Sequence, residues 1–413
     1  MPHPDPEGIL ERLYTALPER ARRLLAAVTQ HALSERFRGR ALYLVGGTVR
    51  DALLGELAAV RDLDVLVEGG DAAPLGRALQ RDLGGVLSCH EAFLTCTLRL
   101  EELELDLATA RRERYAHPGA LPTVEAAPLA DDLERRDFSV NTFALRLAPA
   151  PRLLLSVPGA LEDLRARRLR TLHPASFCDD PTRLVRGSRL AARLGFAYDA
   201  FTAAQAARAL RARAHEQVSP ERLKHELLLT LAEPRVAPAL EHLAMQGKAQ
   251  GEAPGALWAL YGLRTTPWVG ELDALRSRHP VPAESYLIVL LGALSESELA
   301  AHQRRMGWPK RLVSARRRFL AALRGEALDR GSEAEHFALK AARPELAAQL
   351  ERPLLSGEDV LNLGLPAGPH VGAVLRAVAR ARAAGEVRSL DDERRLAQRL
   401  VAGLKPTTPS PRP

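Results

Sequence analysis

The pattern of hydrophobic positions changes part-way along the chain, near Pro158. From Gly8 to Phe37, apolar residues recur at helical spacing, which predicts one or two packed helices. Short segments rich in Val and Leu follow and predict strands of a small mixed α/β domain: "ALYLVGG", "DLDVLVEGG", "GVLSC", "FLTCTLRL", "LELDLATAR" and the closing "SVNTFALRL". Between the last two, Arg111 to Asp132 is rich in Pro and Gly, so it is expected to be an irregular loop.

Beyond Pro158 nearly every segment has a helical period, interrupted by Pro and Gly turns. The change predicts a mixed-sheet head over residues 1–158 and an all-α remainder. We divide that remainder into a neck at 159–235, a body at 236–330 and a tail at 331–413. The last residues, "KPTTPSPRP", have the composition of a disordered end.

Composition narrows the class of protein. Lys plus Arg number 58 against 51 Asp plus Glu, a net charge of +7 that suits a polyanionic partner but also an ordinary solvated surface. The three cysteines are scattered and form no CxxC, which favours a reducing compartment over a disulfide framework. There is no signal pattern at the start, and the longest apolar run, Tyr286 to Leu294, is too short to span a bilayer. We therefore expect a cytoplasmic protein with no membrane partner.

Two glycines follow the first predicted strand. Gly46 and Gly47 would let the backbone approach a bulky anion such as a phosphate, and a helix that begins near Arg50 would point amide donors at it. Arg50 itself would add a cation for that phosphate. Such a glycine pair is also common in plain turns. The next strand decides between the two interpretations.

That strand opens with two acids. Asp62 and Asp64 alternate with apolar residues, so both side chains leave the strand on one face. Like charges side by side are unfavourable unless a cation binds. Together with the glycine turn they predict a site for a magnesium–nucleotide complex, although a solvated strand end would show the same acids. Asp106, in "LELDLAT", is either a third metal ligand or a structural acid.

Four motifs in order carry a resemblance to a known family. They are "LVGGTVRDALLG…RDLDVLV" from Leu44, "RRDFSVNTFAL" at Arg135–Leu145, "DDPTRLVRGSRLAARLGF" at Asp179–Phe196 and "SPERLKHEL" at Ser219–Leu227. The chain resembles the nucleotidyltransferase superfamily of DNA polymerase β, and within it the class II (bacterial-type) tRNA nucleotidyltransferase and poly(A) polymerase family. The resemblance covers roughly the first half of the chain and implies a polymerase β-like head.

The second motif is expected to handle ribose and triphosphate. Arg135 and Arg136 suit phosphate, while Asp137 and Asn141 suit a ribose hydroxyl or local bracing. A structural ion-pair cluster would use the same residue types, and one of the two arginines is expected to have that role.

The third motif is implied to read the base. Asp180 and Arg183 are three residues apart, so a helix would place them on one face. A carboxylate beside a guanidinium matches the exocyclic amine and ring-nitrogen acceptor that cytosine and adenine share. In isolation the pair would be taken for a surface ion pair. Arg186 and Arg189 continue along the helix, where they would line the triphosphate side or the acceptor-stem side, or be solvated.

Two positions depart from the family pattern. Asp179 replaces the family's Glu beside the base-reading pair, and "SVPGA" at Ser156–Ala160 replaces an Asp-Pro-x-Gly-Gly turn. The first puts in question how Arg183 is held, and the second whether that turn tunes movement of the head.

The C-terminal half contains basic stretches. In "KRLVSARRRFLAALR", Lys310, Arg311 and Arg316 to Arg318 are expected to bind RNA phosphates, or to form a solvated face. The turn at Leu363–Gly372 either presses backbone amides against RNA or caps two helices. We expect tRNA and nucleoside triphosphates as partners, and no obligate protein partner is evident.

The resemblance implies a Mg²⁺-dependent, two-metal nucleotidyltransferase that adds CCA, or its terminal A, to tRNA from CTP and ATP. The alternatives are a CC-adding enzyme, a poly(A) polymerase and a non-catalytic RNA-binding relative. Intact Asp62 and Asp64 oppose the last, and the chain lacks the long basic extension of poly(A) polymerases. CC-only members have a shortened loop between the first two motifs. The length of Arg111–Asp132 therefore favours A-competent activity.

Overall fold

The computed structural model describes residues 5–57, 60, 62–101, 103–247, 255–326, 331–351, 355–383, 386–387 and 390–404. The expected disordered end from Lys405 lies outside these residues. The chain divides into two compact units, Met1–Gly262 and Leu263–Pro413, which are described separately. The finer division into head, neck, body and tail remains a prediction.

The first unit contains a seven-stranded mixed sheet of strand order β3-β4-β5-β2-β1-β8-β9. Only the β2–β5 pair of this sheet is parallel among the described strands. The strands are β1 (Ala41–Val45), β2 (Asp62–Glu68), β3 (Val86–His90), β4 (Thr95–Leu100), β5 (Leu103–Thr109), β8 (Ala144–Ala148) and β9 (Leu154–Leu155). The mixed sheet predicted from the sequence is confirmed.

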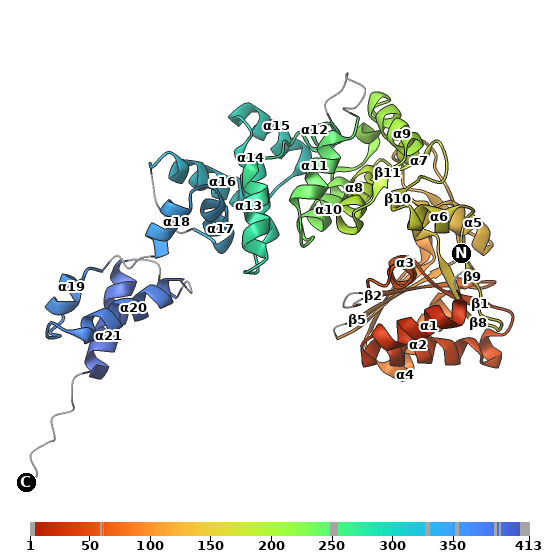
Figure 1. Cartoon of the computed structure of the whole chain (residues 1–413), viewed down its shortest axis with the longest axis horizontal. Coiled ribbons are helices and arrows are strands. Elements are labelled where there is room, and N and C mark those ends of the chain that lie inside the picture. The colour runs from red at the N-terminus through yellow and green to blue at the C-terminus, as the bar shows by residue number, and fades with distance from the viewer. Residues whose placement is uncertain are drawn as a thin grey trace, which may run out of the picture. The chain divides into compact units, whose positions relative to one another are not determined.

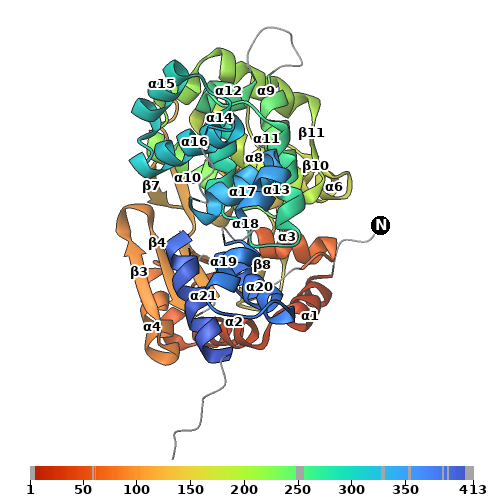
Figure 2. The same cartoon turned by 90° about the vertical axis from the view of Figure 1, so that its left-hand side faces the viewer.

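Helices cover both faces of this sheet. The helices α1 (Pro6–Ala16), α2 (Glu19–Ala32) and α4 (Ala73–Leu83) lie together on one face, as Figures 1 and 2 show. Because strand side chains alternate, Tyr43 and Val45 point to the opposite face, where they pack with Leu129 and Leu133 of α5 (Leu129–Glu134). The central strands β1, β2 and β8 are therefore largely buried, whereas β3 at the edge of the sheet is mostly exposed.

The segment expected to be an irregular loop is a β-hairpin, so that prediction was wrong. Strands β6 (Arg111–Arg114) and β7 (Thr123–Ala126) pair antiparallel, and α5 follows them. Cross-strand ion pairs stabilise the hairpin, because Arg112 and Arg114 both reach Glu125. The Pro and Gly residues that suggested a loop occupy its turn. Part of "SVNTFALRL" is likewise not strand but a 3₁₀ turn, η3 (Ser139–Asn141).

The cysteines also differ from expectation. Cys89 on β3 and Cys96 on β4 are directly opposite each other and form a disulfide, while Cys178 is free. The sequence spacing did not reveal the pair, because only the antiparallel register of β3 and β4 brings the two residues together.

The rest of the first unit is mainly helical. Helix α8 is at its centre and packs against α10 and α11. The elements are η1 (Glu35–Phe37), α3 (Gly47–Leu54), η2 (Glu91–Phe93), α6 (Ala160–Arg165), β10 (Arg168–Leu169), α7 (Ser176–Asp179), α8 (Thr182–Leu194), β11 (Ala197–Tyr198), α9 (Ala200–Arg211), η4 (Ala214–Gln217), α10 (Pro220–Leu231), α11 (Ala237–Met245) and α12 (Ala256–Tyr261).

The described residues of the second unit form helices and no strand. These are α13 (Pro267–Arg276), α14 (Ala283–Gly292), α15 (Glu296–Met306), α16 (Lys310–Leu323), α17 (Glu333–Ala342), α18 (Pro344–Glu351), α19 (Gly357–Asn362), α20 (Pro369–Ala383) and α21 (Leu390–Leu404). Helix α14, which contains most of the longest apolar run, is buried and packs against α13, α16 and α17. No described helix has both the length and the apolarity to cross a bilayer. The expected cytoplasmic location stays a prediction.

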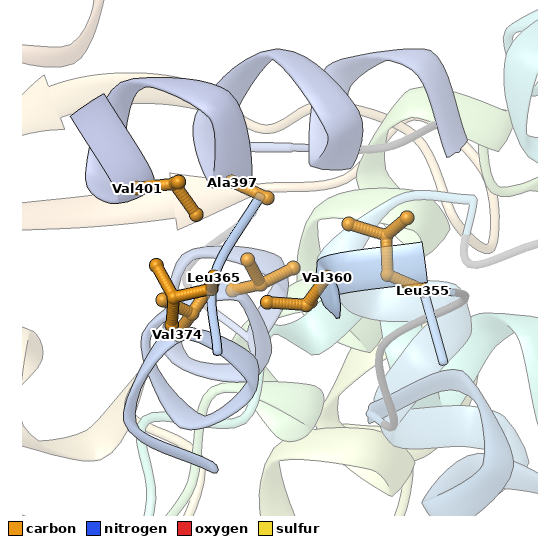
Figure 3. Close-up of a cluster of buried hydrophobic side chains, with 7 residues drawn as sticks. Leu355, Val360, Leu365, Val374, Ala397 and Val401 are labelled. Carbon is orange, nitrogen blue, oxygen red and sulfur yellow. The ribbon is translucent and has the colours of Figure 1, made fainter. Parts of the chain in front are cut away.

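The end of the second unit has a small core of its own. Figure 3 shows Val360, Leu365, Val374, Ala397 and Val401 pointing toward one another from α19, α20, α21 and the turn after α19. Leu365 comes from the turn at Leu363–Gly372 that was expected to contact RNA or to cap helices. One of its side chains is thus part of this core.

Candidate active site

A cavity of about 1100 Å³ lies in the first unit, at the ends of the central strands. It is lined by the turn after β1, by β2 and β5, by the Arg135–Asn141 segment and by α8. Every nucleotide- or metal-binding residue predicted for this unit lines it: Gly46, Gly47, Arg50, Asp62, Asp64, Asp106, Arg135, Arg136, Asp137, Asn141, Asp180, Arg183, Arg186 and Arg189.

The three predicted acids lie on neighbouring strands. Strand register places Asp64 of β2 directly beside Asp106 of β5, with Asp62 two residues earlier on the same face. Leu63 and Val65 between and beyond them are buried, which fixes the outward direction of the acids. Thr97 on β4 donates its hydroxyl to Asp106 Oδ1 at 2.5 Å. The sheet therefore collects three carboxylates from two strands.

The acids repel one another. Burial raises the pKa of Asp64 to about 6, with Asp106 and Asp62 adding to the rise and Arg136 opposing it. Burial also raises the pKa of Asp106, against the hydrogen bond from Thr97. No set of three His, Cys, Asp or Glu side chains within the described ranges is gathered tightly enough to hold a metal alone. The acids fit a hard cation that takes further oxygen ligands from a substrate.

The turn after β1 needs glycine. Gly46 has φ +76°, and a Cβ there would stand 3.0 Å from Asp64 Oδ2. Arg50, on α3, is buried and donates to Asp51 and, from Nη1, to Asn141 Oδ1 at 2.6 Å. Its guanidinium thus ties α3 to the second motif, and its expected contact with phosphate remains a prediction.

Arg135 and Arg136 meet at one acid that was not predicted, Asp132. Its Oδ1 accepts from Arg135 Nη2 at 2.7 Å and its Oδ2 from Arg136 Nη2 at 3.2 Å. Arg135 also donates to Glu113 of the hairpin at 2.7 Å, so both arginines take part in ion pairs. The acids just before "RRDF" in the sequence indicated such an ion-pair cluster. Which acid side chain points toward the two arginines depends on how the residues of α5 are oriented.

Asp137 is held by several donors. Asn141 Nδ2 and the Phe138 amide donate to its Oδ1, and Arg186 Nη2 lies 2.9 Å from its Oδ2. Burial alone would raise the pKa of Asp137, but Arg186 and these hydrogen bonds lower it to about 2. Asp137 is therefore a permanently charged brace between the second motif and α8.

Asp180 and Arg183 do not form the pair expected on one helix face. Helix α8 begins at Thr182, so Asp180 lies before it in extended backbone, with φ −135°. Asp180 Oδ1 accepts from Arg222 Nη2 at 2.8 Å. Arg183 donates instead to Ser176 Oγ at 2.7 Å and to the Arg135 carbonyl at 2.8 Å. Both side chains still line the cavity.

Arg222 is a cavity-lining residue that sequence reasoning missed, although it lies in the fourth motif. Besides Asp180, it donates from Nη1 to the Gly119 carbonyl at 3.0 Å. The Gly119 amide donates to the Asp179 carbonyl at 3.0 Å. The hairpin turn is thus bonded directly to the residues that precede α8. Further along, Arg186 is about half exposed, whereas Arg189 pairs with Glu226 at 2.9 Å.

Comparisons with known proteins identify the family of this chain. The model of the poly A polymerase head domain matches residues 42–170. A CC-adding tRNA nucleotidyltransferase of Deinococcus radiodurans is 40% identical over 374 residues, which is 88% of this chain and 90% of the relative. The chain belongs to the tRNA nucleotidyltransferase and poly(A) polymerase family.

Other relatives of this family match in part. An A-adding tRNA nucleotidyltransferase of Halalkalibacterium halodurans is 45% identical over 192 residues, 46% of this chain and 44% of the relative. The chain therefore spans less than half of that relative's length. A solved CCA-adding enzyme in an apo form has a TM-score of 0.66 at 24% identity, covering 96% of this chain and 99% of the other, which shows the shared fold.

The two departures from the family pattern have local structural contacts. Asp179 Oδ2 lies 3.8 Å from His173 Nδ1, while Arg183 is held by Ser176 rather than by Asp179. In "SVPGA", Gly159 has φ +80° and precedes α6, and Arg170 donates to the Pro158 carbonyl at 2.9 Å. The turn is thus tied to the segment that follows α6.

The basic residues of α16 divide into two groups. Arg316 is buried and donates to the Leu291 and Leu294 carbonyls and to Glu296, so the structure does not support its predicted contact with RNA. Arg318 forms two hydrogen bonds with Glu335. Lys310, Arg311 and Arg317 are exposed. Arg316 is four residues after Leu312 and three before Phe319, so it shares the apolar face of the helix with them. This spacing in the sequence indicated that Arg316 faces inward.

Proposed function

We propose that this protein transfers nucleotides from CTP or ATP to the 3′ end of tRNA without a nucleic-acid template. The observation that carries the proposal is the single cavity where the Asp62–Asp64 strand, the Gly46–Gly47 turn and the Arg135–Arg136 pair meet. Acids for a cation, a close backbone approach and two guanidiniums are what a magnesium–triphosphate complex requires.

Asp62 and Asp64 are assigned to hold Mg²⁺, and Asp106 is positioned to complete the site. Bound Mg²⁺ supplies Lewis-acid activation of the α-phosphate and of the attacking hydroxyl. Arg135 and Arg136 would orient the triphosphate, so that the RNA 3′ oxygen bonds to the α-phosphorus as pyrophosphate departs. No protein nucleophile is needed for this transfer, because the RNA 3′ hydroxyl itself attacks the α-phosphorus.

Asp180 and Arg183 are assigned to select the base. Both line the cavity from the segment around the start of α8. A carboxylate acceptor and a guanidinium donor are complementary to the edge that cytosine and adenine share, and not to that of uracil or guanine. Their separate anchors, Arg222 and Ser176, would let the two groups approach one base from different elements.

Two forms of the activity are supported by different observations. The complete hairpin at β6 and β7 favours addition of CCA or of the terminal A. The match along 90% of a CC-adding relative favours addition of CC. Both forms use the same cavity.

One experiment separates these forms. Transcripts of tRNA that lack CCA, or that end in C, CC or CCA, are incubated with each labelled triphosphate and Mg²⁺. Incorporation of A onto the CC-ended tRNA supports A-competent activity, and arrest after CC supports the second form. Repeated A addition would indicate a poly(A) polymerase. No incorporation on any end, with every triphosphate, would contradict the proposed function.

A further inference from the structure

A buried acid stands behind the two arginines of the cavity wall. The side chain of Asp132, at the end of α5, is fully buried, with 0% exposure. Its Oδ1 accepts from Arg135 Nε at 3.0 Å and Nη2 at 2.7 Å. Its Oδ2 accepts from Arg136 Nε and Nη2 at 3.3 and 3.2 Å. One carboxylate therefore grips two guanidiniums, one with each oxygen.

The two arginines face the cavity, but Asp132 does not line it. Arg136 Nη1 lies 4.0 Å from the Cβ position of Gly46, and Asp64 Oδ2 lies 3.0 Å from that same point. Arg136 Nη1 also donates to the Asn141 carbonyl at 3.0 Å. The guanidinium of Arg136, which Asp132 holds, thus lies close to Asp64, a predicted metal ligand.

The hydrogen bonds to Asp132 restrict the motion of both arginine side chains. An arginine side chain has several rotatable bonds, and two hydrogen bonds from Nε and Nη2 to one carboxylate oxygen restrict the orientation of its guanidinium. A fully buried carboxylate is unfavourable without such partners, so acid and arginines each require the other. Asp132 also accepts from the Arg111 amide at 3.3 Å, which anchors it at the base of the hairpin.

We propose that Asp132 is a positioning residue that fixes Arg135 and Arg136 together toward the triphosphate of the incoming nucleotide. It contacts neither nucleotide nor metal and acts only through the two arginines. The proposal rests on the proposed function, since it assigns the anion that the arginines are held to receive.

The chain offers a matched control for this role. Asp163 on α6 is also buried and also accepts from two arginines, Arg168 Nε at 2.9 Å and Arg170 Nε at 2.7 Å. None of these three residues belongs to the cavity lining among the described residues. Asp163 also accepts from Ser139 Oγ at 2.7 Å, and Ser139 belongs to the second motif but does not line the cavity. Asp132→Asn and Asp163→Asn therefore remove the same charge from two buried sites that each hold two arginines, and only the arginines at Asp132 line the cavity.

The experiment measures thermal unfolding and steady-state addition to a tRNA end that the wild type extends. Both variants should lose thermal stability. Asp132→Asn should raise KM for the triphosphate and lower kcat/KM by roughly 10- to 100-fold, because misplaced phosphate ligands cost that much. Asp163→Asn should leave KM for the triphosphate within about twofold of the wild type. Equal kinetic losses in the two variants would overturn the proposal.

A double-mutant cycle identifies the route of the effect. If Asp132 acts through Arg135 and Arg136, then Asp132→Asn should cost less activity in the Arg136→Ala background than in the wild type, and the remaining loss should come from Arg135. Fully independent, multiplied losses would contradict a positioning role. Should Asp132→Asn fail to fold, Asp132→Glu, which keeps the charge, replaces it in the cycle. An inactive wild type would instead refute the proposed function, so the two failures are distinguishable.

Discussion

The ionised Asp64 carboxylate destabilises the folded protein unless a cation binds beside it. Its folded-state pKa of about 6 lies above the ordinary value of 3.8, so the folded protein binds more protons than the unfolded chain between these pH values. Stability without metal should then fall as pH rises from about 4 to about 6. We predict that Asp64→Asn stabilises the metal-free protein at pH 7 by about 2–3 kcal/mol while abolishing nucleotide addition.

Urea unfolding of both proteins between pH 4 and pH 7, in chelator and in Mg²⁺, tests this prediction. The difference should shrink toward pH 4, where the carboxyl is protonated in the folded state and about half protonated in the unfolded chain, and Mg²⁺ should reduce it at pH 7. A variant that is less stable than the wild type at pH 7 in chelator would show that Asp64 is not under electrostatic strain. Substantial addition by the folded variant would remove Asp64 from the metal site.

Arg183 is the residue on which base selection should depend. Arg183→Ala removes the proposed ring-nitrogen contact, so preference for CTP and ATP over UTP and GTP should decrease. Because Arg183 also bonds Ser176 and the Arg135 carbonyl, some loss of stability should accompany the change. Misincorporation is measured at matched turnover, with Ser176→Ala as a control that removes one anchor and keeps the guanidinium. Unchanged selectivity would assign base choice to other residues.

At the scale of elements, the β6–β7 hairpin links the second motif to the residues before α8. Glu113 reaches Arg135 at its base, and Gly119 reaches Arg222 and Asp179 at its turn. Reading adenine after cytosine requires a differently shaped pocket, and the hairpin is placed to change it. We predict that deleting about ten residues around Pro118–Pro122, a length common for surface loops, abolishes A addition to CC-ended tRNA and spares any CTP incorporation.

Single-turnover ATP addition measures this effect, with circular dichroism to confirm the fold. Arg222→Ala is a milder version that cuts the bonds to Gly119 and Asp180 and should slow A addition more than C addition. ATP addition at the wild-type rate by the deletion variant would rule out the hairpin as a switch. It would also remove the main reason to prefer A-competent activity.

At the scale of the whole molecule, the excess of basic residues should determine how tRNA binding responds to salt. Affinity is expected to fall log-linearly with salt concentration, with a slope of about 0.7–0.9 per phosphate contact. Replacing exposed Lys310, Arg311 and Arg317 with Ala should flatten this slope. Arg316→Ala serves as the contrast, because it removes a buried structural residue and should lower stability instead. A salt-insensitive complex would mean that these charges only solvate the surface.

The sequence by itself determined the mixed-sheet head, the helical remainder and many of the cavity residues, although not Arg222 or Glu113. The alternation of polar and apolar residues around Asp62 and Asp64 can be identified from the sequence without knowing the fold. The same is true of the four ordered motifs. A magnesium–triphosphate site would need these residues together, and the predicted residues of the first unit do line one cavity.

Only the tertiary structure decided which side chains hold one another. Asp132 is three and four residues before Arg135 and Arg136, a spacing that one helical turn brings together, whereas Asp180 meets Arg222 only because α10 packs against α8. The helix boundary at Thr182 separated Asp180 from Arg183, and the register of β3 and β4 joined Cys89 to Cys96. Pairing of charges and cysteines across long sequence separations follows from packing and register, whereas the sequence pattern reports mainly on neighbours along one element.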